Sequence, residues 1–113
     1  MCFKKLLEDL GDTGIIKITG SYADGTENEM SDIDFYVLPD KIDTPFSERR
    51  MLKIIEILKK HNINWNSTRN GYISTINSEN KDLPIQLEFC DVFDRRKNRQ
   101  KQIEIEGVAF KTY

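Results

Sequence analysis

Hydrophobic positions in the first third of the chain predict one helix followed by two short strands. Apolar residues three and four positions apart favour a helix over 3–10, which Gly11 ends before a turn at 12–14. Runs of β-branched and apolar residues predict strands over 15–19 and 33–38, and Pro39 closes the second. The stretch between them, 20–30, is small and polar and contains two glycines.

The remaining pattern predicts a second helix and a set of strands. Thr44 is suited to cap a helix that begins at Pro45 and carries a broad apolar face up to residue 58. Strands are expected over 63–68 and 72–76 around a tight Asn70-Gly71 turn, over 85–89, and over 103–110 with Gly107 as a turn or bulge. The charged stretch 94–102 is read as helix or loop. The order of elements predicts an α/β (α+β) fold: a small mixed sheet with helices packed on one face.

Length and composition narrow the class of protein. The 113 residues are 38% hydrophobic and 32% charged, which suits one globular domain over 1–113. The chain has no run of about 18 apolar residues, so no membrane span is expected. The net charge is 17 − 19 = −2, so nucleic acid is not the favoured partner, although the basic run 95–101 keeps it as a minor alternative.

The few cysteines bear on location and on metals. Only Cys2 and Cys90 occur, which favours a reducing, cytoplasmic setting over a disulfide-stapled secreted domain. Together with one histidine they cannot supply the roughly four nitrogen and sulfur ligands of a structural zinc site. Any metal is therefore expected to be a hard cation held by carboxylates.

The segment from Gly20 to Asp34 carries the candidate chemistry. A glycine at the end of a strand allows close backbone approach to a ligand, Ser21 adds a hydroxyl, and a helix starting there would present free N–H groups to a phosphate. Asp32 follows Ser21 by eleven residues, and Asp34 lies two further on. On a strand these two carboxylates share one face, where their repulsion favours a bound cation such as a pair of Mg²⁺ ions.

A third acid would complete such a site, and the strand over 85–89 supplies one. Gln86 and Glu88 alternate with apolar residues, so Glu88 is placed opposite the core side. Asp91 is the rival, but alternation puts it on the apolar side unless a bulge intervenes. A solvated surface acid is the plain alternative for Glu88. Tyr36 shares the predicted face of the two aspartates, either lining the site or lying half-exposed.

These residues resemble a known family. The string formed by Gly20, Ser21, Ala23, Gly25, Thr26, Ser31, Asp32 and Asp34 is similar to that of the DNA polymerase β-like nucleotidyltransferase superfamily, and most of all its minimal nucleotidyltransferase group. The resemblance implies that Gly20 and Ser21, with Asp32 and Asp34, bind a nucleoside triphosphate such as ATP. It also implies that Asp32, Asp34 and Glu88 are catalytic and hold Mg²⁺, with Mn²⁺ as a substitute.

The same resemblance implies the reaction. An acceptor hydroxyl, on a protein or a small molecule, attacks the α-phosphorus, so that a nucleoside monophosphate such as AMP is transferred and pyrophosphate is released. The helical substrate domain of larger relatives has no room in 113 residues. We therefore expect the acceptor to bind a shallow surface, a second copy in a homodimer, or a partner protein, as in an antitoxin-like role.

The chain also departs from the family pattern. Tyr22 and Asp24 stand where relatives often carry arginine, and Glu27 and Glu29 add negative charge beside the expected triphosphate. The basic run 95–101 would compensate if it folded over the site. Two alternatives to the enzyme follow: a catalytically inactive nucleotide-binding or regulatory module, and an antitoxin-like interaction subunit that uses the fold as a scaffold.

Overall fold

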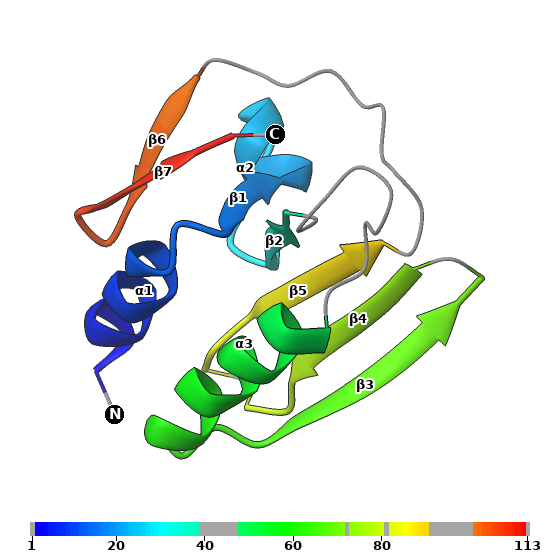
Figure 1. Cartoon of the computed structure of the whole chain (residues 1–113). Helices are drawn as coiled ribbons and strands as arrows, with labels where there is room; N and C mark the ends of the chain where they lie inside the picture. The colour runs from blue at the N-terminus through cyan, green and yellow to red at the C-terminus, as the bar shows by residue number, and fades with distance from the viewer. Residues whose placement is uncertain (1, 39–47, 72, 81, 91–100, 113) are drawn as a thin grey trace.

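Five strands form one mixed sheet with a parallel pair at its centre (Figure 1). The computed structural model describes residues 2–38, 48–71, 73–80, 82–90 and 101–112. Across the sheet the strands are β1 (Ile16–Thr19), β2 (Ile33–Val37), β5 (Ile85–Cys90), β4 (Ile73–Ser78) and β3 (Trp65–Asn70). Only the β2–β5 pair among these is parallel. This mixed sheet with its helices confirms the predicted fold class.

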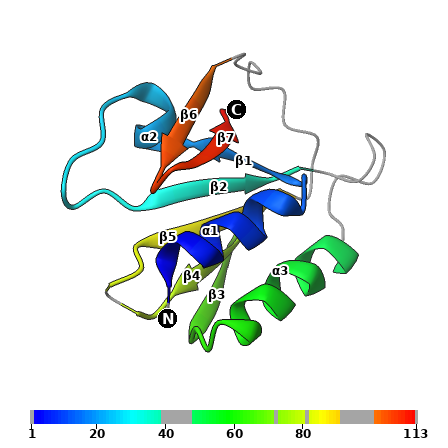
Figure 2. The ribbon, with the colours of Figure 1, turned by 90° about the vertical axis from the view of Figure 1, so that its left-hand side faces the viewer.

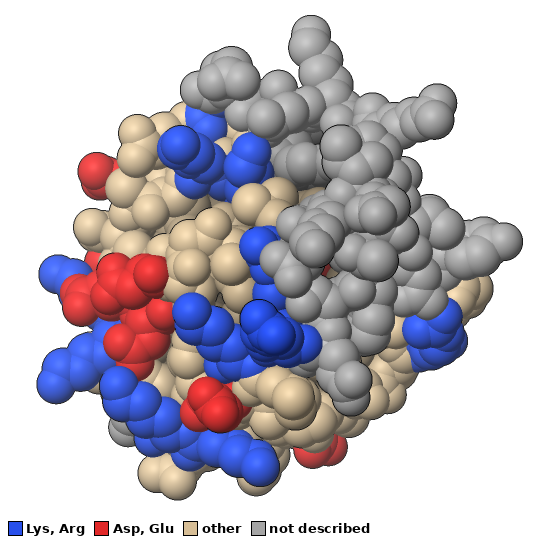
Figure 3. Space-filling view, viewed as in Figure 1, with Lys and Arg blue, Asp and Glu red and all other residues tan. Residues whose placement is uncertain are grey.

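Two helices supply most of the packing against the apolar side of the sheet. They are α1 (Phe3–Asp12) and α3 (Glu48–Lys60), whose buried leucines and isoleucine belong to the same core as the strands. The helices are joined at their ends, where Asp9 Oδ2 lies 2.7 Å from His61 Nε2 and 3.2 Å from Lys60 Nζ. On their outer surface, basic and acidic side chains intermingle (Figure 3).

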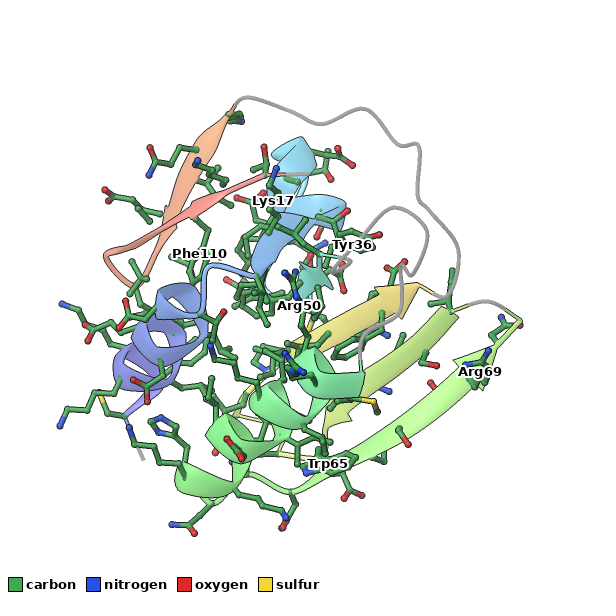
Figure 4. All side chains as sticks on the ribbon, viewed as in Figure 1. Lys17, Tyr36, Arg50, Trp65, Arg69 and Phe110 are labelled. Carbon is green, nitrogen blue, oxygen red and sulfur yellow. The ribbon has the colours of Figure 1, made fainter. Side chains whose placement is uncertain are left out.

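Alternation along the central strands separates the sheet into an apolar face and a polar face. In register across three strands, Phe35 pairs with Leu87 and Leu87 with Ile76, and each of these side chains is at most 1% exposed. Burying such side chains stabilises the fold by about 1.5–3 kcal/mol each. Arg50 Nη1 of α3 donates to the carbonyl oxygen of Leu38, 2.7 Å away, which ties the helix to the end of β2 (Figure 4).

The C-terminal part forms a hairpin instead of the single strand predicted over 103–110. Strands β6 (Gln102–Ile105) and β7 (Val108–Lys111) pair antiparallel around Glu106 and Gly107. Both turn residues have positive φ, 53° and 77°, which is the geometry of a tight two-residue hairpin turn. Of the two roles left open for Gly107, a turn or a bulge, the structure shows the turn, which divides the apolar run into two strands.

Other boundaries differ by a few residues. Helix α1 continues through Gly11, which is not its end, and α2 (Gly20–Asp24) is one short turn against β1 and β2. The predicted hairpin is confirmed, but Asn70 is the last residue of β3 and pairs with Ile73, so the turn begins at Gly71, which has a φ of 63°. The predicted helix start at Thr44 and Pro45 and most of the charged stretch 94–102 lie outside the described residues.

Candidate active site

The two aspartates lie where β2 begins. Asp32 directly precedes the strand and is exposed, while Asp34 is its second residue and is half-buried. Ile33 and Phe35 on either side of Asp34 are at most 2% exposed. The predicted division of this strand into an acidic face and an apolar face is therefore confirmed.

Glu88 of β5 lies on the same face as Asp34. The parallel register pairs Asp34 with Gln86 and Tyr36 with Glu88, so the glutamate is one row further along the neighbouring strand. Burial raises the pKa of Asp34 above its ordinary value, and the nearby charges of Asp32 and Glu88 raise it further. Asp34 therefore lies within electrostatic reach of both other carboxylates. Asp91, the rival third acid, lies outside the described residues.

Gly20 brings the glycine-serine pair against these carboxylates. The antiparallel register of β1 and β2 pairs Thr19 with Asp34, and the chain turns directly afterwards. Gly20 has a φ of 69°, and a Cβ atom there would overlap Asp34 Oδ2 and lie 3.1 Å from its Cγ. Glycine is thus required twice at this position, once by backbone conformation and once by space.

The loop between α2 and β2 is organised by short polar contacts. Helix α2 ends at Gly25 with a φ of 75°, and the Thr26 amide donates to the Ser21 carbonyl at 3.0 Å. Further on, the Asn28 amide donates to Ser31 Oγ at 2.9 Å, and the Met30 amide donates to Asn28 Oδ1 at 2.8 Å. These bonds lead the exposed loop into Asp32.

The structure rejects one of the two alternatives for Tyr36, which was expected either to line the site or to lie half-exposed. It follows Asp34 on the polar face but is only 1% exposed, so it is not a half-exposed strand residue (Figure 4). Its register neighbours are Lys17 on one side and Glu88 on the other. Lys17 was missed by sequence reasoning, although a lysine between two isoleucines in a short strand is a signal that it faces away from the core.

Asp34 has two further polar neighbours, of which Thr19 was missed and Gln86 had been placed only on the polar face of its own strand. Thr19 and Gln86 flank it in register, and the threonine is only 8% exposed. Thr19 is the last residue of a β-branched strand, a position where threonine is common, so only the strand pairing reveals that it lies beside a carboxylate. The row Thr19–Asp34–Gln86 places hydrogen-bonding groups on both sides of the acid.

The donor chemistry of this site suits a hard cation. Carboxylate oxygens are the ligands that Mg²⁺ prefers, and a cation would offset the repulsion that raises the pKa of Asp34. Within the described ranges, no three His, Cys, Asp or Glu side chains lie close enough together to hold one ion. Mg²⁺ needs fewer, because it is commonly bound by one or two carboxylates with substrate phosphate oxygens completing its shell. The residues present therefore fit such an ion.

Comparison with known families decides the class of this protein. The family model of the nucleotidyltransferase domain matches residues 2–109, which is nearly the whole chain. The chain belongs to the nucleotidyltransferase domain family. This membership agrees with the Gly20-Ser21 and Asp32/Asp34 arrangement and supports nucleotidyl transfer from a nucleotide substrate. No curated protein and no solved structure matches the chain significantly.

One finding on membranes completes the description. In the part of this nucleotidyltransferase domain that the structure describes, every helix is too short or too polar to cross a membrane.

Proposed function

We propose that this nucleotidyltransferase moves a nucleoside monophosphate, such as AMP, from a nucleoside triphosphate to a hydroxyl group with the help of Mg²⁺ or Mn²⁺. Gly20 and Ser21 would bind the β- and γ-phosphates of the nucleoside triphosphate. Asp32 and Asp34 would hold the metal, and through it the α-phosphate. Glu88, on the neighbouring strand, would accept the proton of the attacking hydroxyl; the three carboxylates are not placed to hold one ion together. The acceptor is a protein or a small molecule.

The observation that carries this proposal is the contact between Gly20 and Asp34. The backbone of a phosphate-binding motif can lie against a carboxylate only where a side chain is missing, and here a Cβ atom would overlap Asp34 Oδ2. The same carboxylate is influenced by the charges of Asp32 and Glu88. The backbone that we propose to bind phosphate therefore lies against a carboxylate that we propose to bind the metal, and this closeness supports in-line transfer.

The chemistry follows from this placement. The acceptor oxygen forms a bond to the α-phosphorus while the bond from that phosphorus to the bridging oxygen of the β-phosphate breaks. Pyrophosphate leaves with the electron pair, and the hydroxyl proton passes to a carboxylate, for which Glu88 is suited by its place beside the aspartates. The bound metal offsets the negative charge that develops on the phosphate oxygens.

A binding and turnover experiment tests this function. Thermal unfolding would be followed with ATP, GTP, CTP and UTP, each with and without Mg²⁺, since a ligand that binds only the folded state raises the melting temperature. We expect a shift that needs both triphosphate and metal and that disappears in the Asp32→Asn/Asp34→Asn double variant. Pyrophosphate release should fall at least about thousandfold in that variant, equivalent to about 4 kcal/mol.

The outcome separates this function from the two alternatives. Binding without pyrophosphate release, with candidate acceptors present, would favour the inactive nucleotide-binding module. The exposed acidic residues Asp24, Glu27 and Glu29, which follow Gly20 along the chain, are the observation in its favour. No metal-dependent shift with any nucleotide would contradict the proposed function and favour an interaction subunit.

A further inference from the structure

A pocket of about 450 Å³ opens beside Asp32, which forms part of its wall. Its walls come from the end of the α2–β2 loop, from the end of β4 with the residues that follow it, and from the start of β5. Figure 2 shows the α2–β2 connection and the β4–β5 connection at the same end of the sheet. The volume lies within the range of about 300–1,000 Å³ that is usual for small-molecule pockets.

The order of elements at this end of the sheet indicates which part of a nucleotide would reach the pocket. At this end of the sheet, four strand ends lie side by side in the order of the sheet. They are the end of β1 with its Gly20-Ser21 turn, the start of β2 with its aspartates, the start of β5 and the end of β4. Asp32 belongs both to the carboxylate group and to the pocket wall. A triphosphate that runs from Gly20 to the aspartates therefore places its α-phosphate at Asp32, and whatever is attached to that phosphate continues toward the pocket.

The lining combines an apolar floor with hydrogen-bonding groups. Leu83 and Ile85 line the pocket and are at most 3% exposed, while Met30, which also lines it, is 89% exposed. The Asn77 amide offers both a donor and an acceptor, the two kinds of group that the edge of a nucleobase presents. Among the residues that the structure describes, its Nδ2 makes only long contacts, 3.4 Å to Asn66 Oδ1 and 3.4 Å to Thr75 Oγ1.

The charges of the pocket decide which end of the nucleotide it suits. Glu29 and Glu79 stand in its wall with Asp32, so a phosphate group would be repelled. Carboxylates accept hydrogen bonds from ribose hydroxyls, which are neutral donors. An apolar floor, an amide and acidic hydrogen-bond acceptors together suit a nucleoside.

We propose that this pocket binds the base and ribose of the nucleoside triphosphate, with Asn77 and Met30 as specificity-determining residues. The inference rests on the proposed function, because it takes the triphosphate to lie between Gly20 and Asp32. It goes beyond that function by assigning a site to the nucleoside and by leaving the Glu88 side of the sheet to the acceptor.

Calorimetric binding of ATP and of inorganic tripolyphosphate, both with Mg²⁺, tests the proposal. Tripolyphosphate carries the same phosphate chain but no nucleoside, so the ratio of the two affinities reports the pocket alone. The Asn77→Ala variant should lose about tenfold in ATP affinity, the effect of about one hydrogen bond, and keep its tripolyphosphate affinity. Met30→Ala, which alters an exposed side chain and leaves the core untouched, should lose about threefold for ATP only.

Two control variants match these changes outside the pocket. Asn70→Ala removes an exposed amide at the far end of β3, and Leu52→Ala removes an apolar side chain of α3 that is 55% exposed. Both should leave the affinities for ATP and tripolyphosphate unchanged.

The outcomes separate failure of the pocket from failure of the function. If the wild type binds ATP no more tightly than tripolyphosphate, or if Asn77→Ala and Met30→Ala keep full ATP affinity, the nucleoside lies elsewhere and the pocket proposal is overturned alone. Equal weakening of both ligands in the variants would also overturn it. A wild type that binds neither ligand would overturn the proposed function and the pocket together.

Discussion

The two faces of the sheet are built by the same strands but have opposite character. On the face toward α1 and α3, Phe35 and Leu87 are fully buried in one continuous core. On the other face, their chain neighbours Asp34 and Glu88 form an acidic group in which one carboxyl has a raised pKa. Successive residues of one strand thus alternate between the buried core and the candidate site.

This contrast shows how a chain of 113 residues can present a group of acidic side chains on one face of its sheet. A strand with period two needs no separate scaffold for the site, because the apolar residues that fix its register also fix the direction of the acids between them. Crowding of like charge on the polar face costs stability, and the buried face offsets that cost. Substitutions on the two faces should therefore separate activity from stability.

The largest expected effect is on activity and lies on the polar face. Glu88→Gln removes a negative charge from the acidic group without changing its shape, so transfer should fall at least about thousandfold, equivalent to about 4 kcal/mol, with little change in the melting temperature. Asp91→Asn is the matched comparison and should cost far less. Pyrophosphate release measures both, and the reverse ranking would mean that Asp91 is the third acid.

The next effect is on stability and lies on the apolar face. Leu87→Ala, one residue from Glu88, leaves a cavity between Phe35 and Ile76 and should lower the free energy of unfolding by about 3 kcal/mol. Urea denaturation measures it, with the exposed Thr68→Ala as a control of small effect. A loss below about 1 kcal/mol would show that the core relaxes around the cavity and that the two faces differ less than their burial indicates.

A pair of glycines sharpens the contrast between the site and an ordinary turn. Gly14 and Gly20 have nearly equal φ angles, 68° and 69°, but a Cβ atom meets nothing within 4 Å at Gly14 and overlaps Asp34 at Gly20. Alanine at either position costs about 1–2 kcal/mol for the backbone conformation. Gly20→Ala should cost about 1–3 kcal/mol more and should also abolish transfer. Equal unfolding free energies for the two variants would contradict the close contact.

The smallest effect is the pH dependence of Asp34→Asn without metal. The pKa of Asp34 is raised in the folded protein, so its charged form destabilises the fold above the folded pKa and has no effect below the ordinary value of 3.8. In buffer with a chelator, the variant should therefore be more stable than the wild type by about 0.2–1 kcal/mol at pH 7. That gain should shrink as the pH falls toward 4. Urea denaturation over this range measures it, and a gain that grew with acidity would reverse the assigned sign.

Much of the fold and part of the site could be predicted from local pattern. Alternation placed Asp34 and Glu88 opposite Phe35 and Leu87, and the Asn70-Gly71 pair marked the turn between β3 and β4. Local pattern was insufficient at Gly107, because a glycine in an apolar run is compatible with both a bulge and a hairpin turn. The residue that follows β7, Thr112, pairs with Ile18 of β1. Local pattern could not predict this bridge, because the two residues are far apart in the chain.

The sequence by itself determined which residues face the core and which motif the chain carries, because side-chain direction along a strand follows a fixed period and motif spacing is written in the chain. Only the tertiary structure decided that Gly20 lies against Asp34, that Lys17 and Glu88 flank a buried Tyr36, and that a pocket opens beside Asp32. These relations depend on strand order and register, which are set by packing between segments distant in sequence. The conformational preferences of neighbouring residues carry no information about which distant segments pack together.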